Sequence, residues 1–138
     1  MTDYADWTKN LIADIRANGR PTSGYFEGRP VMVLTTTGAK TGKPREAVLT
    51  YSRDGDDYIV VGSKSGAPED PAWIANLVAN PVVTVETDGL TFQAGATVAQ
   101  GADRDALWNR HVAEHPQFAE YPSKTDRVIP IARLTPLG

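Results

Sequence analysis

Hydrophobic residues near the amino end of the chain recur at intervals of three and four. The recurring positions are Tyr4, Trp7, Leu11, Ile12 and Ile15. This spacing places them on one face of a helix over residues 4–17, which Asn18-Gly19 then ends. We expect this face to pack on the rest of the domain, with insertion of Trp7 into a membrane interface as the alternative.

After a connector at residues 18–29, which is rich in glycine and proline, the pattern becomes that of β-strands. The run from Val31 to Thr37 is apolar or β-branched throughout, which is typical of a strand covered on both faces at its start. Another strand is predicted at residues 46–53, where Glu46, Val48, Thr50 and Ser52 alternate with Ala47, Leu49, Tyr51 and Arg53. The remaining predicted strands are 58–63, 82–87, 90–98 and 128–134. The last of them contains Pro130, which favours a sheet edge or a bulge because proline cannot donate to the ladder.

Two further helices are predicted between these strands. Asp70 is a suitable capping residue and Pro71 suits a first helical position, so a helix is expected from there to about Ala79. Asp103 similarly caps a helix that runs to His115, where the following proline ends it.

The order of elements, with tight turns at Asp54-Gly55-Asp56 and Asp88-Gly89, predicts antiparallel strands. We therefore predict an α+β protein, mainly β: a closed or split β-barrel, mostly antiparallel and flanked by helices. With 138 residues, the chain has room for one core, so a single domain over residues 1–138 is expected.

Composition narrows the classes of function. The chain has 14 basic and 17 acidic residues, which gives no overall attraction to nucleic acid. It has no cysteine, which excludes disulfides, thiolate metal sites and cysteine nucleophiles. The amino end lacks the features of a signal peptide, and no apolar run is long enough to span a membrane. We expect a cytoplasmic protein that is a monomer or a homodimer. Peripheral membrane contact through the amino-terminal helix is the alternative to a fully cytoplasmic location.

The stretch from Gly38 to Arg45 carries three cations and a hydroxyl between two predicted strands. It does not fit a Walker A loop, because three residues rather than four separate Gly38 from Gly42, and because Pro44 stands where that motif needs serine or threonine and the start of a helix. A glycine-bounded turn can instead form a nest of backbone donors, to which Lys40, Thr41 and Arg45 would add charge-assisted bonds to a phosphate. The alternative is an ordinary polar hairpin loop.

His111 and His115 fit the H-x-x-E-H pattern of zinc peptidases, in which both rings share one helical face. The helix ends at once, and only Glu120 follows as a further carboxylate ligand. We therefore predict no metal site, and expect either an exposed histidine pair or His115 in a substrate pocket.

Several stretches together resemble the deazaflavin-dependent nitroreductase family of actinobacteria, whose members use coenzyme F420 on a split β-barrel. The matching stretches are Thr36-Thr37-Gly38-Ala39-Lys40-Thr41-Gly42-Lys43-Pro44-Arg45, Ser63-Lys64-Ser65-Gly66-Ala67, Pro71-Ala72-Trp73-Ile74-Ala75-Asn76-Leu77 with Ala79-Asn80-Pro81, and Thr125-Asp126-Arg127-Val128-Ile129-Pro130-Ile131. They span most of the chain after Gly28 and occur in the order of the family, which makes the match more specific than any one loop.

The resemblance implies that the protein is an F420-dependent oxidoreductase that transfers a hydride to an electron-poor acceptor such as a quinone, an enone, a nitro compound or an unsaturated lipid. The residues implied to bind the cofactor phosphate are Lys40, Thr41, Gly42 and Arg45. Those implied around the deazaflavin ring are Val48, Thr50, Ser63, Lys64, Trp73 and Asn76, and Pro44 and Ala67 complete the implied cofactor site.

The resemblance also implies an acceptor site near the carboxyl end, formed by His115, Phe118 and Tyr121. Ser63, Tyr121 and His115 are the candidates for delivering the proton. Two departures stand out: Ala39 occupies a position that is often arginine in the family, and His115 and Phe118 stand where the family has tyrosines. The alternatives are a deazaflavin or lipid carrier without catalysis, and a barrel that binds FMN.

Overall fold

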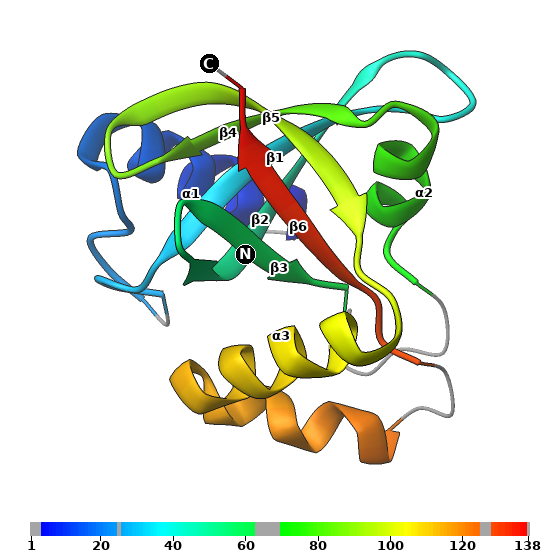
Figure 1. The fold of residues 1–138 in the computed structure, drawn as a ribbon. Coiled ribbons are helices and arrows are strands. Elements are labelled where there is room, and N and C mark those ends of the chain that lie inside the picture. The colour runs from blue at the N-terminus through cyan, green and yellow to red at the C-terminus, as the bar shows by residue number, and fades with distance from the viewer. Residues whose placement is uncertain (1–3, 25, 63–69, 125–127, 138) are drawn as a thin grey trace.

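Antiparallel strands close into a barrel in the order β1-β2-β3-β6-β5-β4 (Figure 1). The computed structural model describes residues 4–24, 26–62, 70–124 and 128–137, with the side chains of residues 4–6 and 121–124 outside that description. The strands are β1 (Val31–Thr37), β2 (Pro44–Asp54), β3 (Asp57–Val61), β4 (Val82–Thr87), β5 (Leu90–Val98) and β6 (Ile131–Pro136). The helices are α1 (Tyr4–Asn18), α2 (Ala72–Ala79), α3 (Gly101–Glu114) and the 3-10 helix η2 (Pro116–Lys124). The predicted fold class is confirmed.

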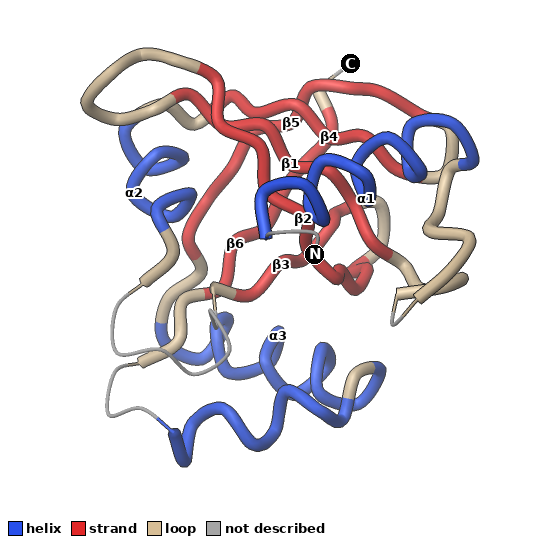
Figure 2. Tube along the Cα trace, turned by 180° about the vertical axis from the view of Figure 1, so that it is seen from behind, coloured by secondary structure: helices blue, strands red, loops and turns tan. Residues whose placement is uncertain are grey.

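Strand β1 is covered on both faces at its start, as its sequence predicts. Met32 and Leu34 point into the barrel core, whereas Val31 and Val33 pack against α1. The apolar stripe of α1 thus lies on the outside of the barrel, where Figure 2 shows the helix crossing the strands. Trp7 lies toward the amino end of that helix, 45% exposed, with its ring centroid 6.2 Å from that of Phe26.

A second cluster packs α3 against the barrel. Leu107 from α3 meets Ile59 and Val61 from β3 and Ile131 from β6 in this cluster. Helices α1 and α3 therefore cover different parts of the barrel. Figures 1 and 2 show α3 and η2 together below the barrel. The described part of the chain contains no helix long and apolar enough to cross a membrane.

Strand β2 is longer than either of its partners, and this length creates the site. Its residues 44–50 pair with β1, and its residues 51–54 pair with β3. The amino-terminal half of β2 and the β1–β2 loop therefore extend past β3 toward α2, as Figure 1 shows.

Three local predictions were wrong, one for a strand and two for helix caps. Strand β6 begins at Ile131 and lies between β3 and β5, so it is not an edge strand. Pro130 precedes the strand and needs no place in its ladder, and its carbonyl accepts a hydrogen bond from the Gly62 N–H at 2.8 Å. At α2, the capping position belongs to Pro71 rather than Asp70, because Pro71 has extended backbone angles of φ −63° and ψ 148°.

Asp103 does not cap α3 either. The capping position is Gln100, which makes no side-chain capping bond, and the helix starts at Gly101, whose φ is +59°. Asp103 instead lies in the first turn, where a negative charge is favourable to the helix dipole.

Candidate functional site

The loop between β1 and β2 is closed by its own backbone. The Gly38 N–H donates to the Lys43 carbonyl at 2.8 Å, and the Gly42 N–H donates to the Gly38 carbonyl at 2.9 Å. Gly42 has φ +69°, a left-handed conformation that costs little only for glycine. The Thr41 hydroxyl accepts a bond from the Lys43 N–H at 3.2 Å, so the loop has a defined shape.

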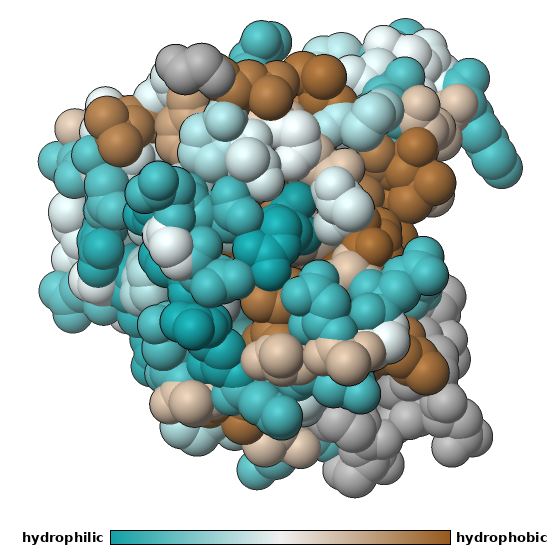
Figure 3. Space-filling view, viewed as in Figure 1, coloured by the Kyte–Doolittle hydropathy of each residue, from teal (hydrophilic) through white to brown (hydrophobic). Residues whose placement is uncertain are grey.

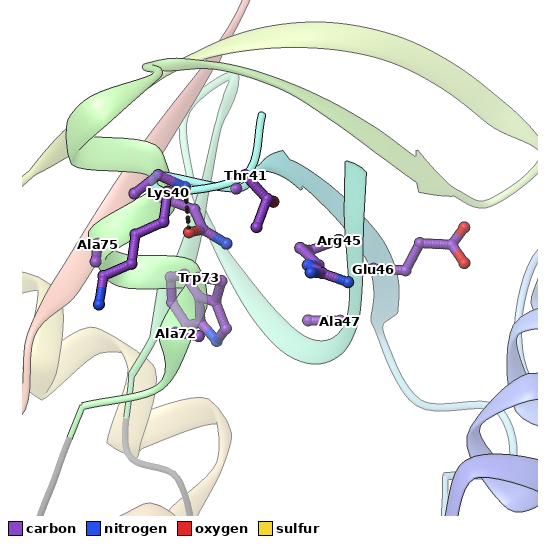
Figure 4. Close-up of a pocket in the computed structure, with 11 residues that line it drawn as sticks. Lys40, Thr41, Arg45, Glu46, Ala47, Ala72, Trp73 and Ala75 are labelled. Atoms are coloured by element: carbon purple, nitrogen blue, oxygen red, sulfur yellow. Dashed lines mark hydrogen bonds between the residues drawn. The ribbon is translucent and has the colours of Figure 1, made fainter. Parts of the chain in front are cut away.

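A cavity of about 480 Å³ lies between this loop and α2. It is lined by Gly38, Ala39, Lys40, Thr41, Arg45, Glu46, Ala47, Ala72, Trp73, Ala75 and Asn76. Figure 4 shows Trp73 on the α2 side and Arg45 with Ala47 on the β2 side. The cavity therefore has a flat aromatic wall, a second wall of small apolar side chains, and a cationic rim.

Alternation along β2 separates the charges of Arg45 and Glu46. Arg45 lines the cavity, whereas the Glu46 carboxylate points away from it toward α1 (Figure 4) and pairs with Arg16. Arg16 also binds Glu86 at 2.8 Å, and this hydrogen bond holds the pKa of the Glu86 carboxyl below its usual value. The Glu46 carboxylate is thus already paired with Arg16 on the α1 side of β2.

The cations of the loop have no acidic partner among the residues that the structure describes. No carboxylate among the described residues forms an ion pair with Lys40, Lys43 or Arg45. Within the same part of the chain, no backbone acceptor takes the N–H of Lys40 or Thr41. Exposed cations beside free backbone donors form a suitable place for a phosphate.

Asn76 joins the two sides of the cavity. Its side chain is 7% exposed, its Oδ1 accepts from the Ala39 N–H at 3.0 Å, and its Nδ2 donates to the Thr36 hydroxyl at 3.1 Å. The first of these bonds is the dashed line in Figure 4. The predicted residues Lys40, Thr41, Arg45, Trp73 and Asn76 are therefore brought together around one cavity.

Other predicted cofactor residues lie elsewhere. Val48 packs with Ile12 and Ile15 of α1, on the face of β2 opposite to Ala47. Thr50 has the same parity as Val48 and pairs in register with Val31, which also faces α1. Gly42 and Pro44 belong to the loop and its exit but do not line the cavity. Ser63, Lys64 and Ala67 lie outside the described residues.

The histidine pair lies in the interior beside α3. His115 is 7% exposed, and its Nε2 donates to the Tyr51 carbonyl at 3.0 Å. His111 is fully buried, with Nδ1 2.9 Å from the Ser52 hydroxyl and its ring centroid 4.6 Å from that of Phe118. Burial, and then the neighbouring His115, lower the pKa of His111 to about 3. The pair is therefore a packed core feature, and the prediction of an exposed pair is wrong.

This geometry also bears on the predicted acceptor site. Neither His115 nor Phe118 lines the cavity, and Phe118 packs against the cluster that joins α3 to the barrel. The side chain of Tyr121 lies outside the description. In the described part of the chain, no group of three potential metal ligands is gathered.

The sequence did not predict the small residues that line the cavity walls, nor the hydrogen bond that the Thr36 hydroxyl accepts from Asn76. Ala72 and Ala75 are three positions apart on α2, and Ala47 faces them from β2, so all three leave room beside Trp73. Alanine at one helical spacing beside a tryptophan was the available signal. A second hollow, of about 1060 Å³, runs between α1 and the start of β2 and shares Arg45 and Glu46 with the cavity.

The chain is similar to a known protein family and to proteins of that family. The model of the F420H(2)-dependent quinone reductase family matches residues 7–136. An F420H(2)-dependent quinone reductase of Mycobacterium tuberculosis is 43% identical over 123 residues, which cover 86% of this chain and 81% of that protein.

Two solved structures are also similar. One, described as the F420-H2 dependent reductase FDR-A, is 38% identical with a TM-score of 0.70, and the match covers 77% of this chain and 94% of that one. Another, described as a domain-swapped dimer, is 34% identical with a TM-score of 0.73, over 96% of this chain and 99% of that one.

Proposed function

The chain belongs to the F420H(2)-dependent quinone reductase family, and we propose from this premise that it is a reductase that binds coenzyme F420 in the cavity between the β1–β2 loop and α2. The observation that carries the proposal is a cavity of about 480 Å³ with an aromatic wall on one side and, on its rim, the cations Lys40 and Arg45, which form no ion pair with any described carboxylate. We further propose that the electron acceptor of this reductase is a quinone, as the names of its relatives suggest.

The residues of the cavity fit such a cofactor. Arg45 offers a forked donor for phosphate oxygens and Lys40 offers a point charge. The Thr41 hydroxyl and the free N–H groups of Lys40 and Thr41 add neutral donors. Trp73, with the small side chain of Ala47 opposite, provides a flat apolar slot for a planar ring.

When bound, the reduced deazaflavin supplies the hydride for reduction of the acceptor. The loop would hold the phosphate, and Trp73 with the alanines of the two walls would offer apolar surfaces that orient the ring. Reduction of a quinone to a quinol also needs a proton. Ser63 and Tyr121 are the proposed donors, because His115 is buried with its Nε2–H bound to the Tyr51 carbonyl.

Arg16 and Arg20 contribute little free charge to this site. Arg16 is bound to Glu46 and Glu86, and Arg20 binds Asp88 at 2.6 Å and the Gly28 carbonyl at 3.1 Å. The hydrogen bond from Arg20 holds the pKa of the Asp88 carboxyl below its usual value, so both remain ionised. We propose that recognition of the cofactor depends on the loop cations rather than on these two arginines.

The test is a titration of the purified protein with oxidised F420, followed by turnover of reduced F420 with menadione as the quinone. We expect micromolar binding, and oxidation of the cofactor only when protein and quinone are both present. A folded protein that fails to bind F420 would overturn the proposal. Binding without turnover across quinone, enone and nitro acceptors would identify a carrier, and preferential binding of FMN would identify a flavin protein.

A further inference from the structure

Helix α2 buries one amide side chain among apolar neighbours. Asn76 is 7% exposed, and the residues flanking it on the buried side include Trp73 and Leu77, which are 7% and 1% exposed. A buried amide without partners costs free energy, so its hydrogen bonds show what the side chain does. Both of its polar atoms are bound to the protein, to Ala39 and to Thr36.

The orientation of the Asn76 amide is determined by the loop. The Ala39 N–H can only donate, so the atom that faces it at 3.0 Å must be the oxygen of the amide. The nitrogen is then directed to the Thr36 hydroxyl at 3.1 Å, near the end of β1. Thr36 itself is 1% exposed and does not line the cavity.

A second asparagine repeats this contact one turn later. The Asn80 Nδ2 donates to the Thr37 carbonyl at 3.3 Å. Three points near the end of β1 are therefore tied to α2, at Thr36, Thr37 and Ala39. The same helix carries Trp73, one turn before Asn76, so the loop and the aromatic wall are held as one unit.

We infer that Asn76 is a positioning residue, which sets the phosphate-binding loop at the correct distance from Trp73 and acts with the buried hydroxyl of Thr36. This inference rests on the proposed function and refines it. Each polar atom of the Asn76 amide already has a protein partner, so we assign its contribution to cofactor binding to the position of the Ala39 backbone and the loop that follows. Trp73 would contact the ring separately from this anchoring.

The informative variant is Thr36→Val, which removes the hydroxyl without touching the cavity. Its matched control is Thr35→Val, the same substitution at the neighbouring position of β1, on the opposite face of the strand. Thr36→Ser keeps the hydroxyl and should therefore keep the hydrogen bond from Asn76. For each variant we would measure the Kd for F420 and the Kd for the deazaflavin fragment that lacks the phosphate.

We expect Thr36→Val to weaken F420 binding by about 5-fold, the effect of about one hydrogen bond, while binding of the fragment changes by less than about 2-fold. Thr36→Ser and Thr35→Val should stay near the wild-type values. Equal losses for F420 and the fragment would indicate general damage and overturn the inference. So would unchanged F420 binding in Thr36→Val beside a strong loss in Asn76→Ala, because that result indicates direct contact of the amide with the ligand.

Hydrogen exchange separates this inference from the proposed function. In protein without cofactor, the Ala39 amide should be protected in the wild type and should exchange faster in Thr36→Val and in Asn76→Ala. If the wild type fails to bind F420 while Ala39 responds in this way, the proposed cofactor is wrong but the anchoring of the loop stands. An Ala39 amide that exchanges at the same rate in all variants would contradict the anchoring itself.

Discussion

Replacement of Gly38 by alanine is a small change that should damage the site with little damage to the fold. A Cβ added at Gly38 would lie 2.6 Å from the Thr41 hydroxyl oxygen and 3.2 Å from the Lys43 carbonyl oxygen. The first distance is shorter than side-chain contacts allow, so Gly38→Ala must displace the Thr41 side chain. Thr41 is exposed and can rotate, so the cost to folding is the lost bond to the Lys43 N–H and a small backbone adjustment.

The expected magnitudes differ for stability and for binding. Loss of one exposed hydrogen bond amounts to about 1 kcal/mol, or about 3–4 °C in Tm for a chain of this size. The displaced hydroxyl would otherwise donate to a charged phosphate, and such a bond is worth about 1.5–3 kcal/mol. We therefore expect Gly38→Ala to weaken F420 binding by at least about 10-fold.

Gly55→Ala is the matched control. Gly55 lies in the β2–β3 turn with φ +60° and open space around its added Cβ, so alanine there costs about 1 kcal/mol through backbone strain alone. Urea unfolding would measure stability, and the change in F420 fluorescence would measure binding. If Gly38→Ala and Gly55→Ala bind F420 equally well, the Thr41 hydroxyl is not part of the phosphate site.

Two further predictions concern the fold. The pKa of His111 is about 3 in the folded protein and near 6.5 in the unfolded chain, so the unfolded chain takes up the proton first as the pH falls. The contribution of neutral His111 to the free energy of unfolding is complete above about pH 6.5 and is lost toward pH 3, by up to about 1.4 kcal/mol per pH unit. We expect Tm to depend less steeply on pH in His111→Phe. An unchanged slope would assign the effect to other groups. Ile15→Ala should lower the free energy of unfolding by about 2–4 kcal/mol because Ile15 is 2% exposed against β1, whereas Val78→Ala, at 65% exposure, should change it by less than about 0.5 kcal/mol. Similar losses in urea unfolding of the two variants would mean that α1 does not contribute a packed core.

The sequence was a good guide to elements whose pattern is local. The continuous run at Val31–Thr37 predicts a strand covered on both faces, and the structure buries Met32 in the barrel and Val33 under α1. The proline before β6 misled the prediction, because the position of a strand in the barrel depends on pairing partners far along the chain. Propensity describes the residue and not its neighbours in space.

The same limit applies to the site. The glycines and cations of the loop are visible in the sequence, but the face of β2 that each residue takes is not visible from composition. Arg45 faces the cavity, whereas Val48, assigned to the ring by resemblance, faces α1. The hydrogen bond from the Ala39 N–H to the Asn76 side chain joins residues 37 positions apart, so no short motif could reveal it.

The central claim is that the β1–β2 loop holds the phosphate of F420 through specific contacts. Arg45 lines the cavity and Lys43 does not, although both are exposed cations of the same loop region. Titration of Arg45→Ala and Lys43→Ala with F420 at physiological salt therefore tests the claim directly. The account predicts a loss of affinity of about 10-fold or more in Arg45→Ala and less than about 3-fold in Lys43→Ala. Equal losses in the two variants would contradict it, because they would show that the loop acts only through its overall charge.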